Sequence, residues 1–135
     1  MSGRYSGVWA VPGGGAVATI EFIAGIEEEV SEIKLRRGRT SGNRIVVFIF
    51  TEVKAMGGLR SFSAGSMKCM RLVDEEGDIE VYPRGTEFFY KNDDDLARLE
   101  FTFELVNEEQ WTRVQRFMER YAERNGMGYQ DRGKS

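Results

Sequence analysis

The segment that reads NEEQWTRVQRFMERYAERNG, near the C-terminus, constrains the fold more than any other part of the chain. Its large apolar side chains recur at spacings of three and four residues, which places them on one stripe of an α-helix. These residues are Trp111, Val114, Phe117, Met118 and Tyr121. Asn107 and Gln110 have the spacing of a capping box, and Asn125 with Gly126 supplies a left-handed stop. We therefore predict an amphipathic helix over residues 108–125 that packs on another layer.

The residues before this helix alternate between apolar and polar, which is typical of a strand with one buried face. Leu99, Phe101, Phe103 and Leu105 fall on that buried face. Residues 44–53 read RIVVFIFTEV, and this continuous apolar run predicts a strand covered on both faces. Shorter patterns predict further strands over residues 18–23, 32–36, 67–74, 79–82 and 86–91. In the strand over residues 32–36 we expect Ile33 and Leu35 to point inward.

Antiparallel strands followed by one terminal helix predict an α+β fold. We expect about six to seven strands in an antiparallel sheet or sandwich-like layer, with the C-terminal helix packed on it. Residues 18–130 are expected to form one domain, because a chain of 135 residues can bury a single core. The glycine-rich residues 1–17 are predicted to be a flexible tail, and residues 131–135 a disordered C-terminus. In the long connection over residues 54–66, Leu59 and Phe62 are expected to anchor a short helical turn.

The composition excludes several kinds of chemistry. The chain has no histidine, so neither a Ser-His nor a Cys-His nucleophile can be assembled. Cys69 is the only cysteine, which rules out an internal disulfide, and we expect it to pack as a small apolar side chain in a strand. The acidic runs at residues 27–29 and 93–95 lack the spacing of a calcium-binding loop and are interpreted as solvated surface. We therefore predict no catalytic, cofactor-binding or metal-binding residue.

The net charge of -3 argues against a dedicated nucleic-acid-binding protein. One predicted hairpin is nevertheless basic, because it contains Lys34, Arg36, Arg37, Arg39 and Arg44. One interpretation is a solvated hairpin tip. The other is a basic patch that steers the domain onto an acidic surface or anionic lipid headgroups, with RNA as a weaker variant. Arg113 and Arg116 on the predicted helix are further candidate contacts, unless they only pair with Glu109 and Glu119 at helical spacing.

The run RFMERYAERNGMGYQ, residues 116–130, resembles the C-terminal signature of the small soluble photosystem II assembly protein family, also called the thirteen-kilodalton photosystem II protein. The likeness continues through MRLVDEEGDIEV (70–81), FIF (48–50) and ATIEFIAGI (18–26), so it covers residues 18–130. The helix signature is its specific part, because it fixes aromatic, charged and glycine positions together. The resemblance implies an assembly or repair factor, without enzymatic activity or cofactor, that binds transiently to the cytoplasmic or stromal face of a photosystem II assembly intermediate.

The resemblance also implies partners and a location. Members of the family contact the inner chlorophyll-binding antenna subunit and the neighbouring reaction-centre subunits of photosystem II. We therefore expect a monomer, peripheral to the thylakoid membrane of a cyanobacterium or plastid, that contacts the membrane indirectly and binds no nucleic acid. No apolar run in the sequence approaches the roughly 18 residues that a membrane-spanning helix needs.

Strand addition is the mechanism that we expect, because a partner peptide can pair with a free sheet edge and later leave without chemistry. We predict that residues 44–53 or the neighbouring strand supply this edge. The predicted partner-binding residues are Arg36, Arg37, Arg44, Lys54, Arg113 and Arg116. The alternatives are a small module that binds RNA or anionic lipid and a hydrolase built from carboxylates alone.

Overall fold

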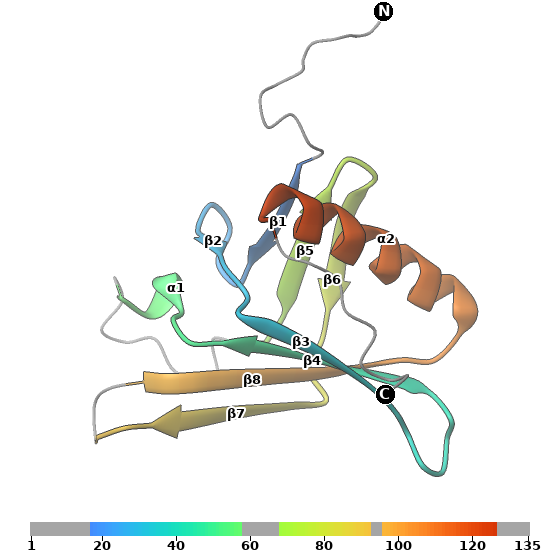
Figure 1. Cartoon of the computed structure of the whole chain (residues 1–135), viewed down its shortest axis with the longest axis horizontal. Helices are drawn as coiled ribbons and strands as arrows, with labels where there is room; N and C mark the ends of the chain where they lie inside the picture. The colour runs from blue at the N-terminus through green and yellow to red at the C-terminus, as the bar shows by residue number, and fades with distance from the viewer. Residues whose placement is uncertain (1–16, 58–67, 93–95, 127–135) are drawn as a thin grey trace, which may run out of the picture.

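The computed structural model describes residues 17–57, 68–92 and 96–126, and the structural statements below refer to these residues. They form two four-stranded antiparallel sheets and one long helix, so the α+β prediction is confirmed (Figure 1). The first sheet has the spatial order β2 (Glu27–Glu28), β1 (Ala18–Glu21), β5 (Met70–Asp74) and β6 (Gly77–Val81). The second has the order β3 (Glu32–Arg37), β4 (Arg44–Phe50), β8 (Leu96–Leu105) and β7 (Gly85–Tyr90). The helices are α1 (Lys54–Gly57) and α2 (Glu108–Arg124).

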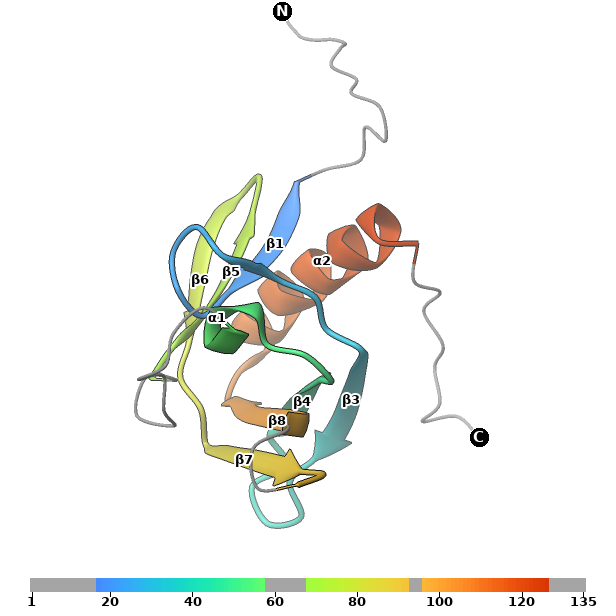
Figure 2. The same cartoon turned by 90° about the vertical axis from the view of Figure 1, so that its left-hand side faces the viewer.

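The core joins the inner faces of the two sheets to the apolar stripe of α2. Helix α2 lies against β1 and β5 in both cartoon views and also touches β8 (Figures 1 and 2). The fully buried side chains come from all three parts: Ile20, Met70 and Leu72 from the first sheet, Phe48, Phe50, Leu99 and Phe101 from the second, and Phe117 and Tyr121 from α2. Phe22, just after β1, links the two sheets, because its ring meets that of Phe50 edge-on at 5.2 Å between centroids.

Strands β4 and β8 form the centre of the second sheet and follow their sequence patterns. In β8, Leu99, Phe101 and Phe103 are buried, as their alternation predicts. Five successive residues of β4, Val46 to Phe50, are buried, which confirms a strand covered on both faces. The two strands pair along their length, from Arg44 opposite Leu105 to Phe50 opposite Leu99.

The ends of α2 also follow the sequence. The side-chain oxygen of Asn107 accepts a hydrogen bond from the Gln110 amide at 2.8 Å, and the Gln110 side chain accepts one from the Val106 amide at 2.8 Å. Gly126, with φ of 69°, adopts the left-handed conformation that ends the helix. The buried Tyr121 hydroxyl accepts a hydrogen bond from the Val30 amide at 3.0 Å, which ties the segment between β2 and β3 to the helix.

Three details differ from the sequence-based expectations. Leu35 lies opposite the buried Val46 but is 42% exposed, because β3 is an edge strand and little packs over it. Glu28, expected on a solvated surface, is only 2% exposed, because its carboxylate accepts hydrogen bonds from the Lys54 and Ala55 amides at the start of α1. Cys69 is half-buried and precedes β5 rather than lying within it.

Several expectations fall outside the described residues. These are the N-terminal tail up to residue 16, the turn anchored by Leu59 and Phe62, the acidic run at residues 93–95 and the C-terminal residues from 127 onward. Within the described residues, no helix has both the length and the hydropathy required to cross a membrane.

Candidate functional site

The prediction that the strand over residues 44–53 itself supplies the free edge for a partner peptide is wrong. Strand β4 pairs with β3 on one side, from Glu32–Ile49 to Arg37–Arg44, and with β8 on the other. A strand that is paired on both sides has no backbone groups left for a partner peptide. Among the described residues, by contrast, the neighbouring strand β3 is the first strand of its sheet and pairs with β4 alone. The free edge next to the predicted strand is therefore β3.

The backbone of β3 offers alternate residues to a partner. At the end of the strand, the Gly38 amide donates to the Asn43 carbonyl at 2.7 Å. Hydrogen-bonded and non-hydrogen-bonded pairs alternate along an antiparallel ladder, so Lys34 and Arg36 bond to β4. The N–H and C=O groups of Ile33, Leu35 and Arg37 consequently face away from β4. These are the groups that an added strand would use.

Three arginines of the β3–β4 hairpin, Arg36, Arg37 and Arg39, differ from the others in the described part of the chain. Eight of the eleven described arginines have a carboxylate oxygen within 4.0 Å: Arg44, Arg71, Arg84, Arg98, Arg113, Arg116, Arg120 and Arg124. Within the described ranges, Arg36, Arg37 and Arg39 have no such partner, and all three are exposed. The Arg37 guanidinium donates to the Gly42 carbonyl at 3.0 Å. Of the described arginines, those without a carboxylate partner thus lie in or directly after β3.

Arg44 and Lys54, two other predicted contacts, lie elsewhere. The Arg44 guanidinium donates to the Glu108 carboxylate at 2.6 Å and stacks over the Trp111 ring, 4.7 Å from its centroid. It therefore joins β4 to the first turn of α2. Lys54 starts α1, beyond the other end of β4, and Figure 1 shows α1 far from the β3–β4 turn. The structure does not bring Lys54 together with Arg36 and Arg37.

Arg113 and Arg116 belong to a network that joins α2 to the turn between β5 and β6. The Arg113 guanidinium donates to both oxygens of Asp74, at 3.0 and 2.7 Å, and Arg120 donates to Asp74 at 2.8 Å. Arg116 makes a bidentate pair with Glu76, at 2.7 and 2.8 Å. Arg120 also approaches Glu76, at 2.6 Å. The expected helical pairs with Glu109 and Glu119 are absent from the described residues, because these turn carboxylates take their place.

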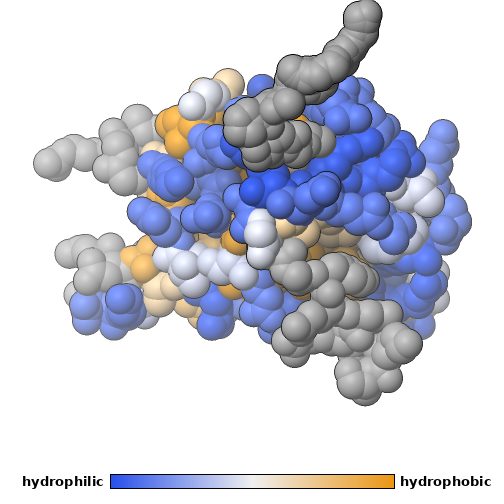
Figure 3. All heavy atoms as spheres, turned by 45° about the horizontal axis from the view of Figure 1, so that its top comes forward, coloured by the Kyte–Doolittle hydropathy of each residue, from blue (hydrophilic) through white to orange (hydrophobic). Residues whose placement is uncertain are grey.

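This network shifts the pKa values of its carboxylates. The hydrogen bonds from Arg116 and then Arg120 lower the pKa of Glu76 to about 2. Burial of Asp74 by itself raises its pKa, but the hydrogen bonds from Arg113 and Arg120 outweigh burial and hold the pKa below its usual range. The Asp74 side chain is 0% exposed, whereas that of Arg116 is 47% exposed on the largely hydrophilic outer side of α2 (Figure 3). Of the two helix arginines, Arg116 is the more accessible to a partner.

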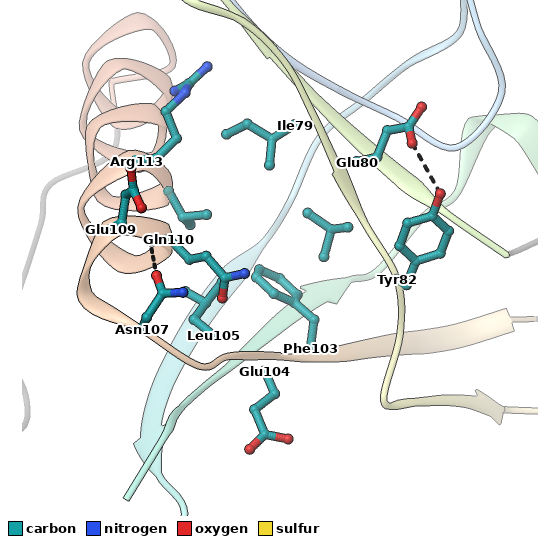
Figure 4. A pocket seen from close by; sticks show the side chains of 12 residues that line it. Ile79, Glu80, Tyr82, Phe103, Glu104, Leu105, Asn107, Glu109, Gln110 and Arg113 are labelled. Atoms are coloured by element: carbon teal, nitrogen blue, oxygen red, sulfur yellow. Dashed lines mark hydrogen bonds between the residues drawn. The ribbon is translucent and has the colours of Figure 1, made fainter.

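A groove of about 540 Å³ runs between β6 and the first half of α2. Its apolar lining includes Ile79, Val81, Phe103, Leu105 and Val114. On its rim, Glu109 and Arg113 of the helix stand across the opening from Glu80 and Tyr82 (Figure 4). No motif in the sequence marks this groove, because its walls come from β6, the end of β8 and α2, which meet only in the folded chain.

The groove lacks the arrangement that a carboxylate-based hydrolase requires. Glu80 and Glu109 lie on opposite walls, and Glu104 points away from the opening (Figure 4). The Tyr82 hydroxyl donates to Glu80 at 3.0 Å, and this hydrogen bond raises the pKa of Tyr82. Burial, followed by the nearby Glu80 charge, raises the pKa of the Cys69 thiol, which disfavours the reactive thiolate. Among the described residues, no group of three or more Asp, Glu or Cys side chains is placed to hold a metal ion.

Comparison with known proteins gives one consistent family. Residues 20–129 match the family model described as Psb28 protein. A photosystem II reaction center Psb28 protein of Synechococcus elongatus is 35% identical over 114 residues, covering 83% of this chain and 96% of that protein. A photosystem II assembly factor Psb28 protein of Thermosynechococcus vestitus is 34% identical, over 86% of this chain and 95% of its own length. A photosystem II reaction center Psb28 protein of Nostoc punctiforme is 37% identical over 83% of this chain and 95% of that protein.

Proposed function

This chain belongs to the Psb28 protein family, and from that premise we propose that it is a non-enzymatic factor in the assembly or repair of photosystem II. It binds transiently to the cytoplasmic or stromal face of an assembly intermediate. There it contacts the inner chlorophyll-binding antenna subunit and the neighbouring reaction-centre subunits, and it lies peripheral to the thylakoid membrane. The relative named as an assembly factor supports this role.

The observation that carries the proposed mode of binding is the free edge of β3. Outward N–H and C=O groups at Ile33, Leu35 and Arg37 can pair with an extended segment of a partner. The exposed Leu35 side chain gives such a segment an apolar contact. Backbone pairing supplies affinity without a covalent step, so the factor can leave once the complex matures.

The arginines of the hairpin complete this surface. Arg36, Arg37 and Arg39 have no carboxylate partner within the residues that the structure describes, so an acidic partner would not have to displace an internal ion pair. Desolvation and loss of an existing pair are the main costs of recruiting a charged side chain. On this ground the hairpin arginines form the primary charged rim, and Arg116 is a secondary contact because it already binds Glu76.

RNA binding, the alternative from the basic hairpin, receives less support. Phe48 and Phe50 are buried and cannot stack on bases. The outward Phe89 lies on β7, at the opposite edge of the sheet from β3, and it contacts Arg98 at 4.2 Å. The Phe89 ring and the unpaired arginines are thus separated by β4 and β8, whereas an RNA-binding surface would place them together.

A proline at Leu35 tests the proposed edge. Leu35→Pro removes one outward N–H and leaves the hydrogen bonds between β3 and β4 in place, since proline is tolerated at edge positions whose N–H faces solvent. Leu35→Ala is the matched control, because it shortens the same side chain and keeps the N–H. We expect Leu35→Pro to recover much less photosystem II core protein from detergent-solubilised thylakoids than either Leu35→Ala or the unmodified protein.

Two outcomes of this pull-down would overturn the proposal. Equal recovery with all three proteins would mean that the β3 edge is not the binding surface. Failure of the unmodified protein to recover chlorophyll-binding core subunits would contradict the assembly role itself. Thermal unfolding of each variant confirms that any loss of binding does not come from a loss of fold.

A further inference from the structure

The turn between β3 and β4 encloses a second hollow, of about 500 Å³. Its polar lining is formed by Arg36, Arg37, Arg39, Thr40, Ser41 and Arg84, and we call it the hairpin pocket. The proposed strand addition at β3 uses backbone groups along the strand and does not require this pocket. Arg84 comes from the segment between β6 and β7. Its backbone amide donates to the Thr102 carbonyl at 2.7 Å, which fixes this segment against β8.

The charge of the hairpin pocket is strongly one-sided. Four of the residues that line it are arginines, and Glu104 is the one acidic residue among them. That carboxylate is already engaged, because Glu104 accepts a hydrogen bond from the Asn43 side chain at 2.8 Å and lies 3.8 Å from Arg84. Like charges held close together repel each other, so an anion that binds among these arginines lowers the electrostatic free energy.

The pocket also presents hydrogen-bond donors besides the arginines. Within the described residues, the amides of Arg39, Thr40 and Ser41 make no hydrogen bond, whereas those of Gly38 and Gly42 close the turn. Thr40 lines the same hollow. Gly38 keeps the turn tight, because a Cβ atom there would lie 2.7 Å from the Ser41 hydroxyl oxygen. Several donors therefore surround one small volume.

This combination selects the chemistry of the ligand. A guanidinium presents a planar pair of N–H donors that matches the oxygens of phosphate and of sulfate. A tetrahedral oxyanion can accept from several donors that approach from different directions, which a planar carboxylate does less well. Four arginines against one carboxylate also leave enough positive charge for an anion that carries more than one negative charge.

We propose that the hairpin pocket binds a phosphate or sulfate group. Such a group is found both in the headgroups of anionic lipids and in free anions of the surrounding solution. If a lipid supplies it, the chain gains a direct contact with the membrane surface beside its protein partner. If a free anion supplies it, occupancy reduces the positive charge next to the β3 edge and thereby weakens attraction to an acidic partner.

Two probes distinguish the sources. Inorganic pyrophosphate, titrated into the full chain by calorimetry, tests the free anion. Vesicles of phosphatidylcholine with and without phosphatidylglycerol, used in a flotation assay, test the lipid. The pocket variant is Arg36→Gln with Arg39→Gln, and the charge-matched control is Lys68→Gln with Lys91→Gln, two exposed lysines outside the pocket.

We expect the unmodified chain to bind pyrophosphate, phosphatidylglycerol vesicles or both. The pocket variant should bind the same probe with an affinity at least about tenfold lower, since it loses two charge-assisted contacts. The lysine control should bind as the unmodified chain does. Leu35→Pro should also keep anion binding, so failure of strand addition and failure of this site give different results. Absence of binding to both probes, or an equal loss in the lysine control, would overturn the proposal.

Discussion

The arginines of α2 and those of the β3–β4 hairpin show how one residue type serves two purposes in the same small domain. On α2, Arg113, Arg116 and Arg120 converge on the turn between β5 and β6, where Asp74 and Glu76 accept their hydrogen bonds. On the hairpin, Arg36 and Arg39 have no carboxylate partner in the part of the chain that the structure describes.

The difference lies in what faces each set. The carboxylate of Asp74 is completely buried, so losing its partners would leave an uncompensated charge inside the protein. Arg36, Arg37 and Arg39 are exposed, and removing one of them leaves no buried charge uncompensated. The arginines of α2 therefore support the fold, whereas those of the hairpin are available to a ligand.

The largest predicted effect is on the buried end of the helix network. Replacing Asp74 with alanine removes the buried carboxylate to which Arg113 and Arg120 donate, and which also accepts a hydrogen bond from the Glu76 amide. We expect the free energy of unfolding to fall by about 3 kcal/mol, the cost typical of breaking a buried ion pair. Chemical denaturation measures this change. A loss no larger than that of a surface substitution would show that the network does not hold α2 in place.

Acid should weaken the same network without any mutation. Because the folded pKa of Glu76 lies at about 2, below its ordinary value of 4.5, the ionised form is favoured in the folded state. The resulting stability is complete above pH 4.5 and is lost as the pH falls toward 2. The lowered pKa of Asp74 acts in the same direction.

The variant Glu76→Gln separates this contribution from the rest. We expect its unfolding free energy to depend less on pH in the acidic range than that of the unmodified protein. Denaturation curves recorded at successive pH values provide the comparison. Parallel pH profiles for the two proteins would contradict the role assigned to the pairs that Glu76 makes with Arg116 and Arg120.

A smaller effect is predicted at the exposed end of the network. Arg116 is 47% exposed and its partner Glu76 is 28% exposed, so solvent screens their attraction. We expect Arg116→Gln to lower the free energy of unfolding by a small fraction of the loss caused by Asp74→Ala, although the contact is bidentate. Comparing this loss with that of Asp74→Ala shows how much burial, rather than charge alone, determines the stability that an arginine–carboxylate pair contributes.

The sequence predicts the elements whose signals are local. Helix α2 and its capped ends follow from spacings within one segment, and the alternation of Leu99, Phe101 and Phe103 identifies β8 and its buried face. The apolar run of β4 correctly predicts burial on both faces. These patterns need no knowledge of the rest of the chain.

The details that the sequence does not predict depend on distant partners. That β4 is a central strand is decided by β8, whose paired residues run from Leu99 opposite Phe50 to Leu105 opposite Arg44, far along the chain from β4. Arg113 could satisfy its charge with Glu109 nearby, but it pairs with Asp74, 39 residues away, since the buried carboxylate has the greater need of a donor. Glu28 is buried for the same kind of reason, because it supplies acceptors to the first amides of α1.

The account rests on the claim that the hairpin arginines recognise a partner without supporting the fold. The most direct test measures how much photosystem II core protein each of two double variants recovers from detergent-solubilised thylakoids. The test variant is Arg36→Gln with Arg37→Gln, and the control is Lys68→Gln with Lys91→Gln. We predict that the arginine variant recovers far less core protein although its free energy of unfolding changes by no more than about 0.5 kcal/mol. Full recovery by the arginine variant, or a loss of binding that merely follows a loss of stability, would contradict the account.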